Sequence, residues 1–560
     1  MNFKYIKNIL PVAALALTAG LSSCTGDLDV TPIDPSTVMT VDEPALYAKC
    51  YANMALAGNG GANGDCDIDG LDGGTTGYVR QLFNANELTT DESICGWGDE
   101  GIAGFDYNAW DSSHPMLKGF YYRLYAGINY CNHYLEVCGD VDATRNAEVR
   151  FLRALNYYFL MDCFGNVPFA LQLSSETAYQ IKRADLFSWL EAELLGKAVK
   201  ITAMNHDDVV LVERAEGNGI LDGLQAAVAR TSKDAGYGRV DKDGANLLLA
   251  RMYLNAEVYT GNARWADAQK YAEIVIKGPH KLWETGKNGW SAYQMLFMGD
   301  NGESGASVEA ILPLLQDGKT TTSWGTSLFL MASTWKSDMD EAGNYGTTEF
   351  WSGNRCRSQL IEKFFPNGAP YETISNTAKA AADNRALFHG LDRKLKVENV
   401  GEFTDGFSCG KFRNTYSDGS NPHGSQFVDM DYFLMRSAEA YLIAAEADAR
   451  INSGTTSSAG TEYINALRRR ANADASATRY TTEQILDERA KELYYEGFRR
   501  TDLVRYGLFG GPKSNTYLWD YKGSQTAPNG AGFEAYRNIF AIPAEDLNAN
   551  PKLKQNEGYN

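Results

Sequence analysis

The strongest local pattern in the chain lies between residues 481 and 509, and it predicts one long helix. Thr481 and Gln484 stand at capping-box spacing, in which each side chain satisfies a backbone donor at the helix start. Small and apolar residues then recur on one face. A second face carries charges at four-residue spacing, where opposite signs can pair: Glu488, Glu492, Glu496 and Arg500. We therefore expect a scaffold helix with one packing face and one ionic face.

The N-terminus predicts a lipoprotein signal peptide at residues 1–23. Lys4 and Lys7 precede an apolar run that is too short to span a bilayer, and small residues then lead to Cys24. We expect cleavage before Cys24 and lipidation of its thiol. The alternative is an ordinary secretory signal followed by an incidental cysteine.

Charge and cysteine content exclude several classes of protein. The formal net charge is −19, and because residues 1–23 contain two lysines and no acid, their removal leaves −21. Such an acidic chain without a basic run is not expected to bind nucleic acid. Eight further cysteines show no CxxC spacing, so neither a disulfide framework nor a zinc site is indicated.

An acidic loop follows the glycine-rich stretch at residues 58–64. Asp65, Asp67 and Asp69 alternate before a glycine, as at the start of an EF-hand calcium loop, but the twelfth position is Thr76 and cannot supply the closing carboxylate. Calcium therefore remains the alternative interpretation, and no other cofactor is expected. We favour carboxylates that accept hydrogen bonds from the hydroxyl groups of a ligand.

Aromatic residues make up 12% of the chain, and some of them have few apolar neighbours in the sequence. Trp97 lies among glycines and acids, and Trp324 lies in a Thr-, Ser- and Gly-rich segment, so both suit ligand contact better than burial. Broad aromatic faces of this kind bind the apolar faces of sugars. The candidate ligand-binding residues are Asp65, Asp67, Asp91, Trp97, Trp110, Trp324, Arg393 and Tyr416.

The rest of the chain predicts helical pairs on either side of an irregular lobe. Ala and Tyr recur at regular offsets in several helices, which is typical of tetratricopeptide-like repeats. Residues 278–430 instead combine Gly, Asn, Thr and scattered aromatic residues. The expected helices span residues 36–57, 116–137, 146–164, 184–204, 246–258, 265–277, 431–452 and 462–472.

An enzyme is not expected. Glycoside hydrolysis by two carboxylates is the sharpest alternative, but no pair is singled out by its sequence setting. The six histidines match no HExxH spacing, no nucleophile elbow is present, and the glycine-rich loop lacks the lysine of a phosphate-binding loop. The acidic ladder of residues 488–496 is interpreted as structural, with Arg489, Arg499 and Arg500 as its expected partners.

Two motifs resemble those of the SusD/RagB family. Residues 488–505 match E-R-x-x-E-L-x-x-E-G-x-R-R-x-D-L-x-R, and residues 150–168 match R-x-x-R-A-x-x-Y-x-x-L followed by F-G-x-V-P. Together with the signal peptide and the helix at residues 431–449, they occur in the order expected for the family. Residues 27–29 also resemble the acidic export tag of its surface lipoproteins.

The resemblance implies a mainly α, SusD-like fold with tetratricopeptide-like helical pairs. Its expected parts are an N-terminal part at residues 24–277, an inserted irregular lobe at 278–430 and a C-terminal helical part at 431–560. Loops of the lobe would lie beside the N-terminal aromatic loop, so Trp97 and Trp324 would face one site.

The resemblance also implies a function. The chain would be lipid-anchored in the outer membrane, exposed at the cell surface, and would capture an oligosaccharide for a SusC-like TonB-dependent transporter, over which it closes as a lid. The alternative within the family is peptide capture, as in its RagB branch.

Overall fold

Two long helices form the centre of the N-terminal half. α5 (Pro115–Val137) begins with proline, whose missing N–H costs no intrahelical bond at this position. α6 (Ala143–Phe164) is capped by the Asp142 side chain and ends at Gly165, which has a φ of 73°. In the computed structural model, which describes residues 41–339 and 341–559, every residue from 147 to 164 is buried. α6 is therefore a core helix, and α5 packs along it.

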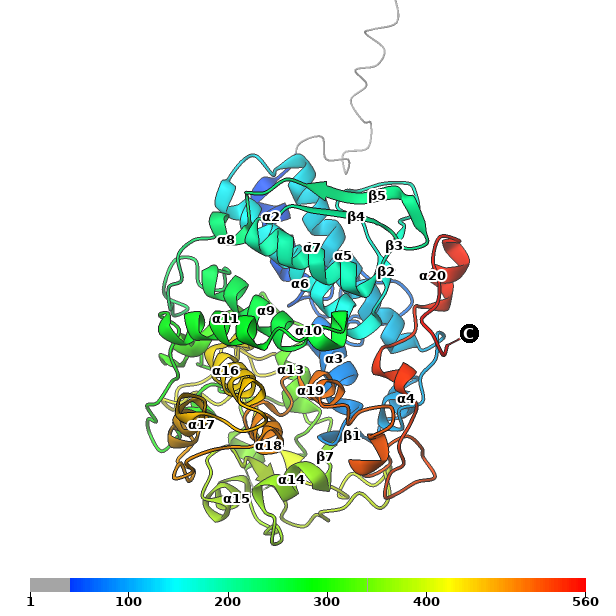
Figure 1. Cartoon of the computed structure of the whole chain (residues 1–560). Coiled ribbons are helices and arrows are strands. Elements are labelled where there is room, and N and C mark those ends of the chain that lie inside the picture. The colour runs from blue at the N-terminus through cyan, green and yellow to red at the C-terminus, as the bar shows by residue number, and fades with distance from the viewer. Residues whose placement is uncertain (1–40, 340, 560) are drawn as a thin grey trace, which may run out of the picture. The chain divides into compact units, whose positions relative to one another are not determined.

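Shorter helices and helical turns surround this pair and continue into the C-terminal half (Figure 1). They are α2 (Glu43–Ala52), α3 (Tyr78–Phe83), η1 (Asn84–Leu88), α4 (Ile102–Asp106), α7 (Arg183–Leu195), α8 (Ile220–Gly223), α9 (Lys242–Leu254), α10 (Ala256–Thr260), α11 (Trp265–Lys277), α12 (Ala292–Met295), η2 (Ala306–Glu309), α13 (Ser327–Ala332), η3 (Ala342–Asn344), α14 (Ser358–Phe364), α15 (Ile374–Ala381), α16 (Ser437–Ile451), α17 (Ser458–Arg470), α18 (Thr482–Leu493), α19 (Arg499–Arg505), η4 (Ser514–Thr516), η5 (Ala535–Asn538) and α20 (Ala544–Ala549). None of the described helices has the length and apolar character needed to cross a membrane.

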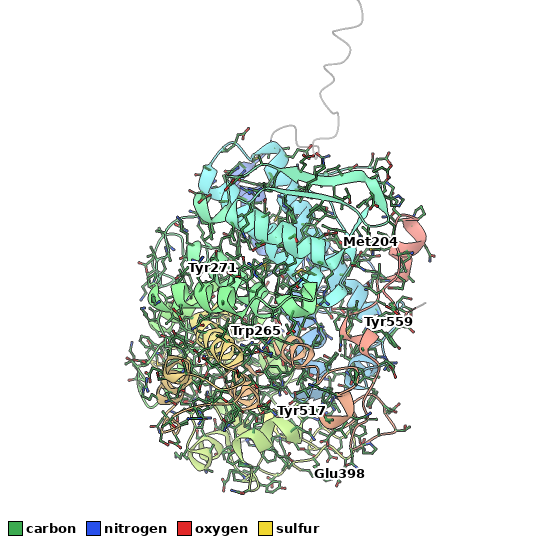
Figure 2. The ribbon with its side chains drawn as sticks, viewed as in Figure 1. Met204, Trp265, Tyr271, Glu398, Tyr517 and Tyr559 are labelled. Carbon is green, nitrogen blue, oxygen red and sulfur yellow. The ribbon has the colours of Figure 1, made fainter. Side chains whose placement is uncertain are left out.

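α11 connects the two helical halves, because it packs on α9 on one side and on α16 on the other. Tyr271 of α11 stacks on Tyr253 of α9, with ring centroids 5.6 Å apart. The Arg450 guanidinium of α16 lies 5.7 Å from the ring of Trp265 (Figure 2). Residues 278–430, which separate these halves in the sequence, therefore leave the helical scaffold and return to it.

Five two-stranded antiparallel sheets connect segments of this scaffold. Three are local in sequence, whereas two join residues more than a hundred positions apart and attach the irregular lobe to the helical parts. The local sheets are β2 (Val167–Pro168) with β3 (Gln180–Ile181), β4 (Val199–Ala203) with β5 (His206–Arg214) and β8 (Phe388–His389) with β9 (Ser408–Cys409), and the long-range sheets are β1 (Ser93–Cys95) with β7 (Asn354–Cys356) and β6 (Ala310–Leu314) with β10 (Tyr432–Arg436).

The mainly helical prediction is confirmed, and so are the helical pair α5–α6 and the helix α11. The helix predicted at residues 184–204 is wrong in its second half, where the β-branched residues of β4 pair with β5. Residues 432–436, predicted as helix, also form a strand, because they pair with β6. The tetratricopeptide-like arrangement and the three-part division stay predictions.

The single helix predicted at residues 481–509 is also wrong, although its start is right. The capping box of Thr481 and Gln484 is present at the beginning of α18. The helix then breaks, because Tyr495 and Gly497 adopt positive φ values of 64° and 89°. The buried Glu87 carboxylate accepts hydrogen bonds from the backbone N–H groups of Gly497 and Phe498, which fixes the break before α19.

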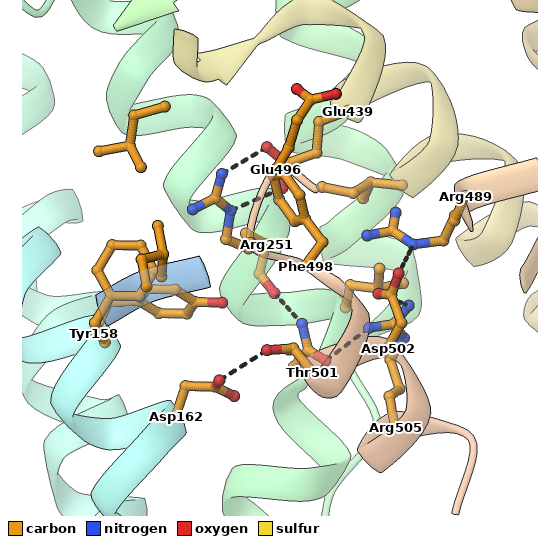
Figure 3. A pocket seen from close by; sticks show the side chains of 17 residues that line it. Tyr158, Asp162, Arg251, Glu439, Arg489, Glu496, Phe498, Thr501, Asp502 and Arg505 are labelled. Atoms are coloured by element: carbon orange, nitrogen blue, oxygen red, sulfur yellow. Dashed lines mark hydrogen bonds and ion pairs between the residues drawn. The ribbon is translucent and has the colours of Figure 1, made fainter. Parts of the chain in front are cut away.

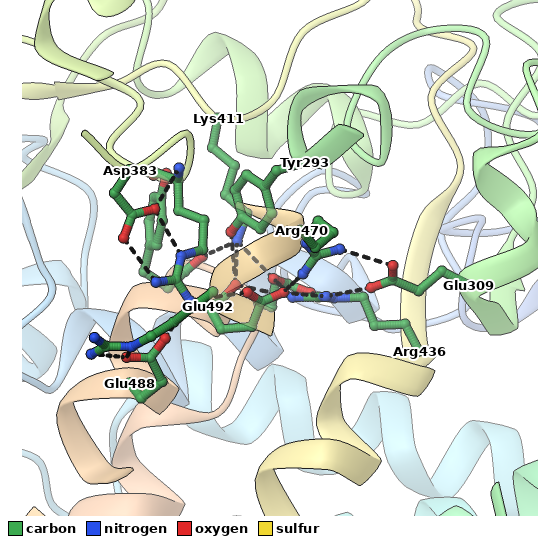
Figure 4. Close-up of polar contacts among 12 residues, drawn as sticks. Tyr293, Glu309, Asp383, Lys411, Arg436, Arg470, Glu488 and Glu492 are labelled. Atoms are coloured by element: carbon green, nitrogen blue, oxygen red, sulfur yellow. Dashed lines mark hydrogen bonds and ion pairs between the residues drawn. The ribbon is translucent and has the colours of Figure 1, made fainter. Parts of the chain in front are cut away.

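The acidic ladder of this segment lies in a buried ion-pair network (Figure 4). Arg436 donates to Glu492 at 2.8 Å and to Glu496 at 2.7 Å, and Arg385 donates to Glu488 at 2.6 Å. The structural interpretation of the ladder agrees with these contacts, but the expected partners were wrong. Arg489, Arg499 and Arg500 instead pair with Asp502, Asp91 and Asp162.

A small cavity lies where α19 meets α6 and α9 (Figure 3). Its volume of about 20 Å³ suits roughly one water molecule. Arg251 and Glu439 form a two-point ion pair at its wall, with distances of 2.7 and 2.6 Å. This cavity therefore belongs to the scaffold and has no room for an organic ligand.

Candidate functional site

The long-range pairing of β1 with β7 brings two tryptophans together. Trp97 follows β1, and Trp351 precedes β7, so the antiparallel arrangement places them at the same end of the sheet. The pairing continues past the strands, since the Gly96 N–H donates to the Gly353 carbonyl at 3.0 Å. The two indole rings lie 6.5 Å apart between centroids. Residues separated by 254 positions therefore share one surface.

Two more rings extend this surface. The Trp324 ring lies 5.9 Å from that of Trp351 and 4.7 Å from that of Phe427. All four side chains are partly exposed, whereas Trp110, Trp189, Trp335 and Trp519 are buried. We call Trp97, Trp324, Trp351 and Phe427 the aromatic platform.

Glycines make the close approach of these segments possible. A Cβ atom on Gly353 would lie 2.1 Å from Nε1 of Trp97, and Gly353 also has a φ of 100°. A Cβ atom on Gly74 would lie 2.8 Å from Cβ of Trp324. Both positions therefore require glycine, which explains why the tryptophans lie in glycine-rich segments.

Polar groups hold the indole rings in place. Trp324 Nε1 donates to Asn63 Oδ1 at 3.0 Å, and Trp351 Nε1 donates to Glu349 Oε2 at 2.7 Å. The other carboxylate oxygen of Glu349 accepts from Gln426 at 2.8 Å. The platform therefore combines fixed ring faces with amide and carboxylate groups at its edge.

The buried side chain of Arg80 packs against the Trp97 ring. The Arg80 guanidinium lies 5.5 Å from the Trp97 ring and 5.3 Å from the Phe329 ring. Burial lowers the pKa of Arg80, with nearby acids opposing the shift. The cation–π contact helps to hold the Trp97 ring in place, and the side chain stays partly exposed.

An amide just before the acidic loop, rather than an aspartate of the loop, contacts the platform. Asn63 of the glycine-rich stretch accepts a hydrogen bond from Trp324, whereas Asp67 pairs with Lys49 at 2.9 Å and with Arg123 at 3.4 Å. Asp65 is exposed, and ligand contact by either aspartate stays a prediction. In the described part of the chain no three or more His, Cys, Asp or Glu side chains gather in an arrangement that would bind a metal.

Two candidate residues lie in the scaffold instead of at the surface. Asp91 is fully buried, and its carboxylate accepts from Arg499 at 2.7 and 2.9 Å and from Tyr517 at 2.7 Å. Burial alone would raise its pKa, but Arg499 and then Lys363 hold that pKa well below its usual range. Trp110 is 3% exposed and donates to Tyr559 at 2.7 Å. Both side chains are buried against other parts of the chain, and ligand contact by either stays a prediction.

The last two candidates contact their own loops rather than the platform rings. Arg393 is buried and donates to the Phe403 carbonyl at 2.8 Å, and burial lowers its pKa to about 10. Tyr416 is buried, with its hydroxyl 3.4 Å from Nδ1 of His423. Their role in ligand binding stays a prediction.

Sequence reasoning missed two platform rings, Trp351 and Phe427. Trp351 was visible only as one of several aromatic residues scattered through the lobe, and Phe427 carried no local signal. Their role depends on the β1–β7 pairing and on the fold of residues 424–428, and no spacing along the chain reveals either. The local sequence offers one hint, since Gly353 lies two residues after Trp351.

The fold and the platform together define a mainly helical protein with a partly exposed aromatic surface built from loops. The SusD family model matches residues 280–559, and starch-binding protein SusD of Bacteroides thetaiotaomicron is 35% identical over 598 aligned residues, which cover 100% of both chains. The chain therefore belongs to the SusD family. SusD-like protein P25 of Formosa agariphila is 22% identical and covers 74% of this chain and 72% of its own.

Solved structures agree with this fold. A laminarin binding SusD-like protein superimposes with a TM-score of 0.63 at 21% identity, covering 92% of this chain and 99% of its own. Surface glycan-binding protein A from Bacteroides uniformis gives a TM-score of 0.62 at 20% identity, with coverage of 92% and 98%. These relatives are named for binding and not for catalysis.

Proposed function

We propose that this protein captures a neutral oligosaccharide on its aromatic platform at the cell surface. The observation that carries the proposal is the continuous set of ring contacts from Trp97 through Trp351 and Trp324 to Phe427. Each ring is partly exposed, and the rings come from four separate loops, so exposure of all four in one place is unlike ordinary core packing. A surface of this kind offers several successive sugar units a face to stack on.

The rim of the platform supports a neutral ligand. Asn63, Glu349 and Gln426 offer amide and carboxylate groups to hydroxyls, and the net charge of −19 disfavours an anionic polymer. Because the most similar curated relative reported above is named for starch binding, an α-1,4-glucan is the first candidate. A β-glucan is the natural comparison, since a structural neighbour is named for laminarin.

Isothermal titration with maltoheptaose, a laminarin oligosaccharide and a mixture of tryptic peptides tests this proposal. We expect heat from a glucan and none from the peptides. Trp324→Ala should weaken glucan binding by at least about tenfold, since truncating a central aromatic contact typically costs ~2 kcal/mol or more. Heat from the peptides alone would replace the proposal with peptide capture, the alternative within the family.

The matched control is Trp265→Ala, which removes an indole from α11 rather than from the platform. This variant should bind the glucan like the wild type. Equal losses in both variants would show that tryptophan removal acts through stability, and an unchanged affinity in Trp324→Ala would remove the platform from the binding site.

We further propose that the captured glycan passes to a SusC-like TonB-dependent transporter, over which the protein closes as a lid. Membership of the SusD family supports this step, as does the predicted lipid on Cys24. Cys24 lies outside the described residues. In this proposal the helical parts face the transporter, and the platform loops hold the sugar.

A further inference from the structure

A second pocket is lined in part by Trp97, and neither Trp324 nor Phe427 belongs to its lining. Its volume is about 370 Å³, near the lower end of the ~300–1,000 Å³ range of small-molecule sites. Its aromatic lining consists of Trp97, Tyr107 and Tyr521, and the rings of the two tyrosines lie 5.9 Å apart, edge to face. We call it the Tyr107 pocket.

The walls of the Tyr107 pocket are fixed by contacts to the backbone. A Cβ atom on Gly96 would lie 2.5 Å from the Val400 carbonyl, so residues 398–401 approach the chain next to Trp97 as closely as glycine allows. Arg355 donates to that same carbonyl at 2.7 Å, and the Tyr521 hydroxyl donates to the Glu398 carbonyl at 2.7 Å. The pocket is therefore built by the fold and not left between mobile side chains.

A buried carboxyl group, that of Asp106, lies in this lining. Asp106 is 1% exposed, and its Oδ1 accepts from the Cys95 N–H at 3.0 Å. Burial raises the pKa of Asp106 to about 7, with Arg357 opposing the shift. A carboxyl group in a pocket lining can accept hydrogen bonds from the hydroxyl groups of a ligand.

The charge of the lining selects among ligands. Asp106 and Glu398 line the pocket, together with the amides of Asn399 and Gln525, and no lysine or arginine does. An anionic ligand would therefore meet repulsion without a compensating cation. A ligand with an apolar face and several hydroxyl groups matches both the rings and the polar atoms.

We propose that the Tyr107 pocket binds one neutral sugar ring, as a site separate from the platform and sharing Trp97 with it. Figure 2 shows Glu398 at the lower edge of the view, away from Trp265 on α11. Because Trp97 forms part of both sites, a glycan held on the platform has its chain end or a branch within reach of the pocket. This last step rests on the proposed glycan capture, whereas the pocket itself does not.

Saturation-transfer NMR with D-glucose, D-galactose and D-mannose tests the proposal on the whole mature protein. We expect signals from at least one of the three sugars. Gly401→Trp should abolish them, because Gly401 lines the pocket and a Cβ atom there meets only Asn399 Oδ1 at 3.5 Å, so an indole can fill the space without displacing the backbone. Gln525→Trp is a second blocking variant, because Gln525 lines the pocket at its exposed edge. It replaces Gly401→Trp if that substitution lowers the melting temperature of the protein.

Gly343→Trp is the matched control, since a Cβ atom at this exposed position has no atom within 4 Å. It should keep the signals. The proposal is overturned if the wild type gives no signals, or if the signals persist in both blocking variants. Ethanolamine is tested in the same experiment as a small cation, and preferential binding of ethanolamine would identify a cation site and also overturn the proposal.

The two proposals fail independently. Trp324→Ala should lose maltoheptaose binding while retaining the monosaccharide signals, because Trp324 does not line the Tyr107 pocket. Gly401→Trp should retain maltoheptaose binding within about threefold, a change of less than ~1 kcal/mol. Loss of maltoheptaose binding with intact monosaccharide signals therefore counts against the platform alone, and the reverse result counts against the pocket alone.

Discussion

At the scale of single residues, glycines decide where the tryptophans can lie. Gly353 combines a φ of 100° with a Cβ position 2.1 Å from Nε1 of Trp97. Any side chain there must both strain the backbone and push the indole aside. Trp97 belongs to the platform and to the Tyr107 pocket, so this one glycine acts on both.

Gly353→Ala should therefore change stability and binding together. The left-handed backbone conformation costs a non-glycine residue ~1–2 kcal/mol, which should appear as a lower free energy of unfolding in urea. Displacement of Trp97 should also weaken maltoheptaose binding by about tenfold in titration calorimetry, equivalent to ~1.4 kcal/mol.

Gly98→Ala is the control for this prediction, because a Cβ atom at Gly98 meets no atom within 4 Å and no positive φ is involved. It should leave both quantities unchanged. If Gly353→Ala behaved like Gly98→Ala, the indole would have to move freely, contrary to the role assigned to Gly353.

The residue scale also shows how far sequence reasoning reached. Trp97 and Trp324 could be chosen because their neighbours are small and polar, and the structure connects them through Trp351. Asp91 was chosen from the same kind of setting, yet it is buried against Arg499, 408 positions away. Local composition predicts whether a side chain lacks apolar neighbours in sequence, but it carries no information on charged partners brought by the fold.

At the scale of elements, the C-terminal signature is a scaffold held by charges. Helices with regular spacing were predictable, since their apolar period and caps are local properties. The break after α18 was not, because Glu87 and Arg436, which fix it, come from distant parts of the chain. The β1–β7 pairing that builds the platform could not be predicted either, because its two strands are distant in the sequence.

Glu492→Gln should lower the free energy of unfolding by about 3 kcal/mol at neutral pH, because Arg436 and Arg470 would remain buried without a full countercharge. Burial alone would raise the Glu492 pKa, but Arg470, Arg436 and Arg385 lower it to about 2 from 4.5. A lowered folded-state pKa means that the carboxylate stabilises fully above pH 4.5 and loses this effect as the pH falls toward 2.

The stability difference between wild type and Glu492→Gln should therefore narrow below pH 4.5, measured by urea unfolding at several pH values. Glu462→Gln is the control, since Glu462 pairs with Arg469 where both side chains are more than half exposed. Its effect should stay within ~0.5 kcal/mol. A pH-independent difference for Glu492→Gln would show that packing, and not charge, explains its cost.

At the scale of the whole molecule, the scaffold and the proposed binding surface are separate parts. Buried ion pairs and helices occupy the interior, whereas the platform and the Tyr107 pocket are assembled from loops that β1 and β7 bring together. Changes to the loops can therefore alter this surface without altering the fold.

The same separation bears on how the protein would be attached to the membrane. The described residues from 47 onward, 47–339 and 341–559, belong to one compact unit, and no described helix can cross a bilayer. A lipid on Cys24 would tether this unit at a single point and leave it able to open and close over a transporter. Cys24→Ser should abolish labelling of the protein by an alkyne-tagged fatty acid. It should also abolish cleavage before position 24, which mass spectrometry of the mature N-terminus measures. Cys66→Ser is the control and should change neither result. Labelling that persists in Cys24→Ser would contradict the anchor, and with it the tethered lid.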